Sequence, residues 1–254
     1  MIMYKHRNLI PILVIVTFIA APAHLDAQDH SVTVFEYLHI PDARKTAFIQ
    51  GELSAGSRTA AAALSAGTIT FWELLEQVGG GDLPGSANFL RVTTYPDIDK
   101  ATGGARTPFR DTGSTVLVSA RYFLHDGGWE MSARAKPDRD LNYVVMLYHN
   151  TDYADSLIAM ERKFWGPFIK QAMDAGRTNQ QAWGNAVLLS PLGDEIKFTT
   201  VSYDLFKTLQ DALMPYIDST LVQPEKEYAM MRKMEKGRRS VVIYRSLKVV
   251  APPN

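Results

Sequence analysis

The stretch that decides the fold is LNYVVMLYHNTDYADSLIAMERKFWGPFIKQAMDAGRTNQQAWGNAVLL, which covers residues 141–189. It begins with a β-type run that ends at His149 and continues as a helical stretch around Glu161. An Ala-Gly pair ending at Gly176 predicts the end of that helix, because glycine accepts the left-handed conformation common there. A second β-type run containing Trp183 follows. The stretch therefore predicts a strand–helix–strand unit.

Residues 31–75, SVTVFEYLHIPDARKTAFIQGELSAGSRTAAAALSAGTITFWELL, carry the same features in the same order. A β-type run ends at His39, a helical stretch contains Glu52, Gly67 closes an Ala-Gly pair, and a second β-type run contains Trp72. Repetition of this kind fixes an architecture before any single residue is interpreted. It does not fix a reaction.

Extending the same analysis along the chain predicts the order β-α-β-β-α-β in each half, which is a ferredoxin-like unit. The second helix of the first half is predicted to be short or broken, because Gly103, Gly104 and Pro108 interrupt it. The predicted strands cover residues 31–38, 68–78, 89–95, 114–124, 143–148, 181–189, 196–203 and 240–249. The predicted helices cover residues 42–65, 96–110, 152–175, 203–214 and 223–236.

A four-stranded ferredoxin-like sheet has helices on one face, so its other apolar face needs a partner. We therefore expect an α+β fold of two tandem ferredoxin-like βαββαβ repeats, packed sheet to sheet as an intramolecular α–β barrel. On the paired His, Glu, Ala-Gly and Trp motifs, residues 31–249 resemble a tandem member of the dimeric α–β barrel superfamily. The second half, with ERKFW and DAG, also resembles a group of exported bacterial proteins of unknown role with that fold.

The first 27 residues have the layout of a secretory signal peptide. Basic residues come first, a mostly apolar run covers 9–21, and small residues precede cleavage after Ala23 or Ala27. We expect a Sec-type signal and a bacterial protein that is periplasmic or secreted, with no stable membrane anchor after signal removal; an uncleaved anchor is the alternative. The predicted organisation is a signal peptide at 1–27, a first repeat at 28–127, a linker at 128–140 and a second repeat at 141–250.

Composition narrows the function classes. The formal net charge is zero, which argues against a nucleic-acid partner, because such a protein needs a clustered basic surface. The chain has no cysteine, so thiolate nucleophiles and cysteine zinc sites are excluded. The histidines lack HxxxH or HExxH spacing, so no metal site is expected. Whether copies of the chain form a homo-oligomer stays open.

Glu161 lies in an apolar helix stripe with Leu157 and Phe164, and Glu52 has a similar setting. A half-buried carboxyl has a raised pKa unless it is paired, and can then carry a proton. The alternative is a structural ion pair, for which Arg245 and, by repeat position, Arg121 are the predicted partners.

The remaining candidates are the paired histidines and tryptophans. His39 and His149 end the first strand of each half, where an imidazole suits a general base or a haem ligand, or simply bonds to a turn. Trp72 and Trp183 are predicted either to fill the core or to stack on a ligand. The resemblance implies handling of small aromatic or polyketide-like molecules, in some members without a cofactor and in others with haem.

Three functions follow from the sequence. The first is an exported small-molecule-binding α–β barrel with the ligand between the sheets and no cofactor, the ligand being contacted by Trp183, Trp72, Glu52, Arg245 and Arg121. The second is a cofactor-independent monooxygenase or isomerase acting on a small organic substrate, with His149, His39 or Glu161 as catalytic candidates; a variant of it binds haem through one histidine. The third is a structural or interaction module whose barrel is filled by side chains.

Overall fold

The computed structural model describes residues 30–81, 87–103, 117–193, 196–237 and 239–252. The predicted signal peptide at 1–27 and the segment 104–116, which contains Pro108, lie outside these residues. Among the helices of the described part of the chain, none is long and apolar enough to cross a membrane.

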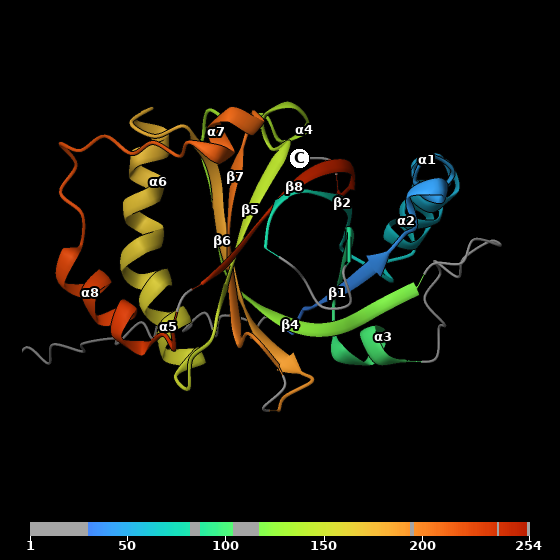
Figure 1. Cartoon of the computed structure of the whole chain (residues 1–254), viewed down its shortest axis with the longest axis horizontal. Coiled ribbons are helices and arrows are strands. Elements are labelled where there is room, and N and C mark those ends of the chain that lie inside the picture. The colour runs from blue at the N-terminus through green and yellow to red at the C-terminus, as the bar shows by residue number, and fades with distance from the viewer. Residues whose placement is uncertain (1–29, 82–86, 104–116, 194–195, 238, 253–254) are drawn as a thin grey trace, which may run out of the picture.

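The strands form a single closed antiparallel barrel (Figure 1), in the order β1-β3-β2-β8-β5-β7-β6-β4. Their bounds are β1 Val32–His39, β2 Phe71–Gly80, β3 Phe89–Tyr95, β4 Leu117–Met131, β5 Tyr143–His149, β6 Gln180–Ser190, β7 Thr200–Phe206 and β8 Ser240–Val250. Within each half the spatial order is fourth, first, third, second strand, which is the ferredoxin-like order. The predicted α+β barrel fold is confirmed.

The two halves meet through hydrogen-bonded strand edges. β2 pairs with β8 and β4 pairs with β6, so each half supplies the neighbour that the other half's edge strand lacks. Closure removes the unpaired edges that would otherwise attract other strands. β4 continues to Met131, so the first residues of the predicted linker 128–140 belong to a strand that spans the junction.

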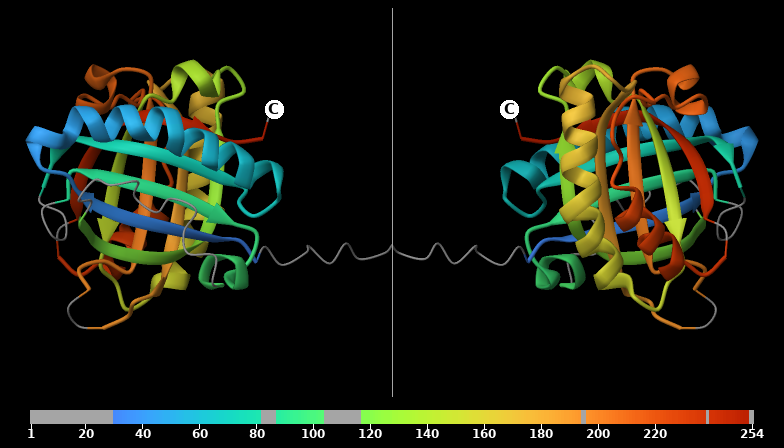
Figure 2. Two further views of the ribbon diagram at one scale, coloured as in Figure 1. Left: turned by 90° about the vertical axis from the view of Figure 1, so that its right-hand side faces the viewer. Right: turned by 90° about the vertical axis from the view of Figure 1, so that its left-hand side faces the viewer.

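A long helix covers the outer face of each half (Figure 2). In the first half it consists of α1 Asp42–Gly51, the π-helical turn η1 Glu52–Gly56 and α2 Ser57–Ser65. In the second half it consists of α5 Ala154–Met160, the π-helical turn η3 Glu161–Trp165 and α6 Gly166–Asp174. Gly67 and Gly176 follow with φ of 65° and 67°, so both glycines take the left-handed conformation predicted after the helices.

The remaining helices are short or lie beside the second half. α3 Ile98–Thr102 is the short second helix of the first half, and the Asp97 side chain caps it by accepting from the Lys100 backbone N–H at 2.7 Å. α4 Pro137–Asp140 precedes β5, α7 Leu209–Leu213 follows β7, and α8 Glu225–Met234 packs against α5 and η3. The predicted helix 203–214 was wrong at its start, because β7 continues to Phe206.

Side chains from both halves fill the barrel interior. Its largest members include Phe35, Tyr122, Tyr244 and Phe198, all buried. The Tyr37 hydroxyl donates to the Tyr148 hydroxyl at 3.0 Å, and Tyr148 lies 3.3 Å from the Tyr244 hydroxyl. The expected ligand cavity between the sheets stays a prediction, and the two pockets described below lie outside this core.

Candidate functional site

A cavity of about 70 Å³ lies between the outer face of the second-half sheet and its helices. The sheet side comes from β5, β6 and β7, and the helix side comes from η3 and α8. Polar and aromatic groups both reach it, so it can hold a small ligand with a polar end. Its lining residues are Leu147, Glu161, Trp165, Trp183, Ser202, Asp204, Tyr228, Met231 and Arg239. We call it the helix–sheet pocket.

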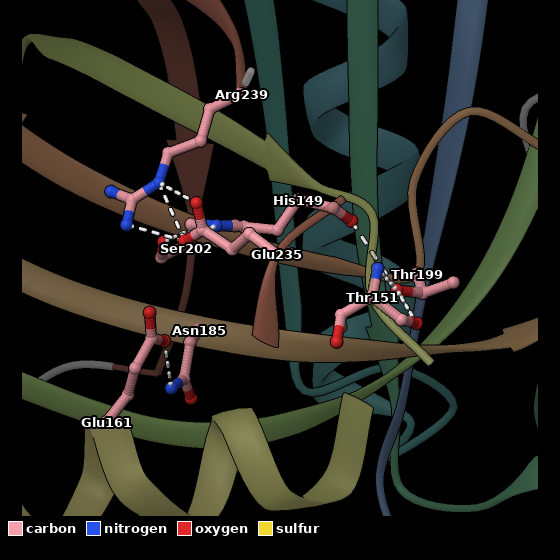
Figure 3. A network of polar contacts seen from close by, with 8 residues as sticks. All are labelled: His149, Thr151, Glu161, Asn185, Thr199, Ser202, Glu235 and Arg239. Atoms are coloured by element: carbon pink, nitrogen blue, oxygen red, sulfur yellow. Dashed lines mark hydrogen bonds and ion pairs between the residues drawn. The ribbon is translucent and has the colours of Figure 1, made fainter. Parts of the chain in front are cut away.

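Glu161 is the first residue of η3, at the point where the helix widens into a π turn. Such turns carry one extra residue and are frequent at functional sites. Its side chain points at the sheet (Figure 3), where its Oε2 accepts a hydrogen bond from Asn185 Nδ2 at 2.8 Å. Burial raises the pKa of the Glu161 carboxyl, although the nearby His149 and Asn185 oppose that rise. The group can therefore hold a proton more readily than an exposed glutamate.

Asp204 is a second buried carboxyl at the same pocket. Burial raises its pKa to about 7, against a hydrogen bond from Gln180 Nε2 at 2.7 Å that favours the ionised form. The nearby Glu161 carboxyl contributes to this rise in the pKa of Asp204. Two carboxyls that titrate above their usual range and line one cavity are typical of sites that bind or move protons.

Ser202, His149, Glu235 and Arg239 form a hydrogen-bonded chain on the sheet side of Glu161 (Figure 3). The His149 side chain is 1% exposed; its Nε2 lies 2.6 Å from Ser202 Oγ and its Nδ1 lies 3.1 Å from Glu235 Oε1. Arg239 Nε donates to both oxygens of Glu235, at 2.9 and 3.0 Å. Burial would raise the pKa of Glu235, but these bonds outweigh burial and lower it to about 2.

The first half closes the corresponding space with an ion-pair cluster. Arg91 NH2 lies 2.5 Å from Glu52 Oε1, and Arg91 NH1 lies 3.3 Å from Glu36 Oε2. Arg91 is the third residue of β3, and Ser202 is the third residue of β7. The long Arg91 side chain thus occupies in the first half the position that the small Ser202 side chain occupies in the second half. The smaller side chain leaves room for the pocket.

The structure places the two predicted histidines differently. Tyr37 and Tyr148 both point into the barrel, and side chains alternate along a strand. His39 comes two residues after Tyr37 and so belongs to the interior face, whereas His149 comes one residue after Tyr148 and faces the helices. His39 is half-buried and does not line the pocket. Only one of the paired histidines therefore joins the site.

Trp72 and Trp183 are both buried on the outer face of the barrel, under the helices. Trp183 lines the helix–sheet pocket, while Trp72 packs in the apolar core below α1 and α2. Trp183 therefore remains a ligand-contact candidate.

The predicted arginine partners were wrong. Arg245 pairs with Glu76 on the neighbouring strand at 2.5 Å, and Arg121 lies 3.7 Å from Glu36. Neither arginine lines the helix–sheet pocket. Arg245 instead lines an open groove of about 410 Å³ with Asn142, Tyr143 and Lys207 among others.

Sequence reasoning missed Ser202, Asp204, Glu235 and Arg239. One signal was present: Thr200, Ser202 and Asp204 alternate along β7 on the face that the helices cover. A covered face is normally apolar, so a polar row there indicates a site. Glu235 and Arg239 follow α8 and come to the site through tertiary packing.

Haem and metal sites were tested on the same geometry. Within the described residues, no group of three or more His, Cys, Asp or Glu side chains could hold a metal ion. Both ring nitrogens of His149 are engaged, with Glu235 and Ser202, and the ring is buried. Haem ligation by His149 does not fit this arrangement.

Comparison with solved structures assigns the fold. The chain is similar to an anthrone oxidase-like protein (15% identity, 89% of this chain and 98% of that chain, TM-score 0.52). It is also similar to a proposed monooxygenase from Lactobacillus acidophilus NCFM (9% identity, 87% and 96%, TM-score 0.53). A third similar structure is a dye-decolorizing peroxidase from Bacteroides thetaiotaomicron VPI-5482 (9% identity, 87% and 94%, TM-score 0.51). The chain thus has the fold of the dimeric α–β barrel superfamily.

No protein-family model matches the sequence, and no curated protein matches it.

Proposed function

We propose that the protein binds a small organic molecule in the helix–sheet pocket of its second half. The observation that carries this proposal is the convergence of Glu161, Asp204 and Arg239 on one cavity walled by Trp165 and Trp183. Apolar walls with a few oriented polar groups are the usual composition of ligand sites. Buried ionisable groups are costly to maintain in a purely structural layer, which favours a function for them.

The dimensions and chemistry of the pocket define the ligand class. A cavity needs about 10–15 Å³ to hold one water molecule. A cavity of about 70 Å³ therefore accepts a group of a few non-hydrogen atoms, such as one end of a larger molecule. Arg239 favours an electron-rich oxygen on that group, and Trp183 favours a planar or apolar surface next to it.

A cofactor-independent enzyme that moves a proton on such a molecule is the second candidate. Glu161 and Asp204 favour it, because carboxyls with raised pKa values serve as acids and bases near neutral pH. The similar structures include a proposed monooxygenase and an anthrone oxidase-like protein, which are fold relations at low identity. Export remains part of the proposal and is supported by the layout of residues 1–27.

The binding proposal is tested by filling the pocket. Small aromatic and carbonyl compounds are screened by native mass spectrometry, with the tryptophan fluorescence of Trp165 and Trp183 as the second readout. Leu147→Phe adds volume at the pocket wall and is expected to abolish binding, whereas Leu192→Phe, at a site 70% exposed, is expected to leave it unchanged. Equal binding by both variants would place the ligand elsewhere and overturn the proposal.

A further inference from the structure

Three side chains beside the pocket have the geometry of an activated nucleophile. Ser202 Oγ lies 2.6 Å from His149 Nε2, and Glu235 Oε1 lies 3.1 Å from His149 Nδ1. A hydroxyl within hydrogen-bond reach of a base, with the base oriented by a carboxylate on its other nitrogen, is the general signature of such a group. The three residues come from β7, from the end of β5 and from the residue after α8.

The hydrogen bonds fix the direction in which a proton can move. The pKa of Glu235 is lowered to about 2, because its bonds with His149 and Arg239 outweigh its burial, so the carboxylate is ionised and can only accept. Nδ1 of His149 must then carry the proton donated to Glu235. In a neutral imidazole this leaves Nε2 as the acceptor of the Ser202 hydroxyl proton, as a general base requires.

Ser202 also opens on the helix–sheet pocket, so its oxygen can meet a bound molecule. Arg239 lines the same pocket, so a positive charge borders the cavity in which an oxyanion would develop. The described residues of the first half lack this arrangement at the matching positions. Arg91 occupies the position that matches Ser202, and Leu38, the residue before the end of β1, occupies the position that matches His149.

We propose that Ser202 is the nucleophile of a hydrolase site for small acyl esters, with His149 as its general base and Glu235 as the residue that positions His149. The inference rests on the proposed helix–sheet pocket as the place where the ester binds. The cavity volume of about 70 Å³ restricts the acyl part to a short group such as acetyl.

The reaction balances with water as the co-reactant. Ser202 Oγ forms a bond to the carbonyl carbon while its proton passes to His149 Nε2, and the collapse of the adduct breaks the bond to the alkoxy group. The leaving alcohol takes the proton from Nε2. Water then attacks the acyl-serine, gives one proton to Nε2, and releases the carboxylic acid as Ser202 recovers its proton. The net change is ester plus water to acid plus alcohol.

The test uses p-nitrophenyl acetate as substrate and a small alkyl fluorophosphonate as covalent probe. Peptide mass spectrometry is expected to find the phosphonyl group on Ser202, and p-nitrophenol is expected to be released with a burst equal to the enzyme concentration. Ser202→Ala is expected to abolish both signals. Ser246→Ala, a strand serine that instead donates to Glu73, is expected to change neither.

Two further variants keep the test independent of folding. Ser202→Cys keeps a nucleophile at the position and is expected to be acetylated, while far-UV circular dichroism checks that each variant is folded. Glu235→Gln is expected to lower turnover by about 10²–10⁴-fold and to alter its pH profile, because an amide no longer selects the productive His149 tautomer. A merely structural Glu235 would leave the pH profile of the remaining activity unchanged.

The outcomes separate the inference from the proposed function. Probe attachment at residues other than Ser202, or no attachment, overturns the hydrolase inference. If a ligand still binds and Leu147→Phe still blocks it, the binding proposal stands while the nucleophile is rejected. If the probe does not attach to Ser202 and no ligand binds in a way that Leu147→Phe blocks, both proposals are rejected.

Discussion

Glu52 and Glu161 each begin a π-helical turn in the helix that covers their half of the barrel, yet their partners differ in charge. Glu52 pairs with the Arg91 guanidinium, whereas Glu161 accepts a hydrogen bond from the neutral Asn185 amide. The ion pair joins Glu52 to a positive charge, whereas burial beside a neutral amide raises the pKa of the Glu161 carboxyl. The first position is thus suited to stability and the second to chemistry.

The Arg91 cluster is expected to be a major source of stability. Arg91→Met would remove the cation that contacts Glu52 and leave the buried Glu36 with only the longer Arg121 contact, at 3.7 Å, which costs about 3–5 kcal/mol in the free energy of unfolding. Urea denaturation followed by circular dichroism measures this. Arg245→Met is the matched control, because the Arg245–Glu76 pair is half-exposed and is worth about 0–1 kcal/mol. Similar losses for both variants would contradict the assigned role of the cluster.

Asp204 is expected to make the protein less stable as the pH rises. Its pKa is raised from 3.8 to about 7 in the folded state, so between these values the folded chain binds more protons than the unfolded chain. Stability must then fall with increasing pH across that window. Asp204→Asn keeps an acceptor for Gln180 and removes the titration, so its melting temperature should exceed that of the wild type more at about pH 8 than at about pH 5.

The control for this experiment is Asp99→Asn, which changes an exposed carboxylate. Glu73, whose pKa burial also raises to about 7, keeps part of the pH dependence in every variant. The prediction therefore concerns the difference between variant and wild type. A difference that is the same at both pH values would show that Asp204 is not buried as described.

The tyrosine cluster should behave as part of the barrel core. Tyr148→Phe removes the hydroxyl that joins Tyr37 and Tyr244, and should cost about 1–3 kcal/mol because the partners stay buried. Tyr153→Phe, at a site 61% exposed, should change the unfolding free energy by less than about 0.5 kcal/mol. Thermal and urea unfolding provide the measurement, and binding in the helix–sheet pocket should be unaffected. Loss of ligand binding in Tyr148→Phe would instead place the site inside the barrel.

Gly184 lets the ring of Tyr203 approach the backbone of β6. A Cβ atom at this position would overlap the ring, so Gly184→Ala should destabilise the protein by about 1–3 kcal/mol. Gly51→Ala is the opposite case, because a Cβ there meets nothing within 4 Å and alanine favours the helix by about 0.5–1 kcal/mol. Differential scanning calorimetry should therefore show a lower melting temperature for Gly184→Ala and a higher one for Gly51→Ala. A lower melting temperature for both variants would contradict the prediction for Gly51→Ala.

The sequence was sufficient for the fold because its signals are local and repeated. Strand alternation, the glycines after each long helix and the order of elements predicted the barrel, and all are present. The π turns were not predicted, because one extra residue in a helix leaves the composition unchanged. The start of the helix predicted at 203–214 was wrong, because β7 continues to Phe206 through residues whose mixed pattern also suits a helix.

The candidate site was predicted only in part. Glu161 and Trp183 do line the pocket, and His149 contacts a lining residue. Glu235 and Arg239 were missed because a distant helix end brings them to β5, and no sequence spacing expresses that contact. The equivalence of His39 and His149 also failed, because a shift of one residue in strand alternation turns a side chain to the opposite face.

Closure of the barrel within one polypeptide has a genetic consequence. In an assembly of identical subunits, any substitution is present in every copy. A mutation that opens a pocket in one subunit would therefore also remove a stabilising ion pair at the equivalent position of the other subunit. Here Arg91 and Ser202 belong to separate codons of one gene. The first half can keep its ion-pair cluster while the residues of the pocket in the second half change. A change of function in the second half therefore need not destabilise the barrel.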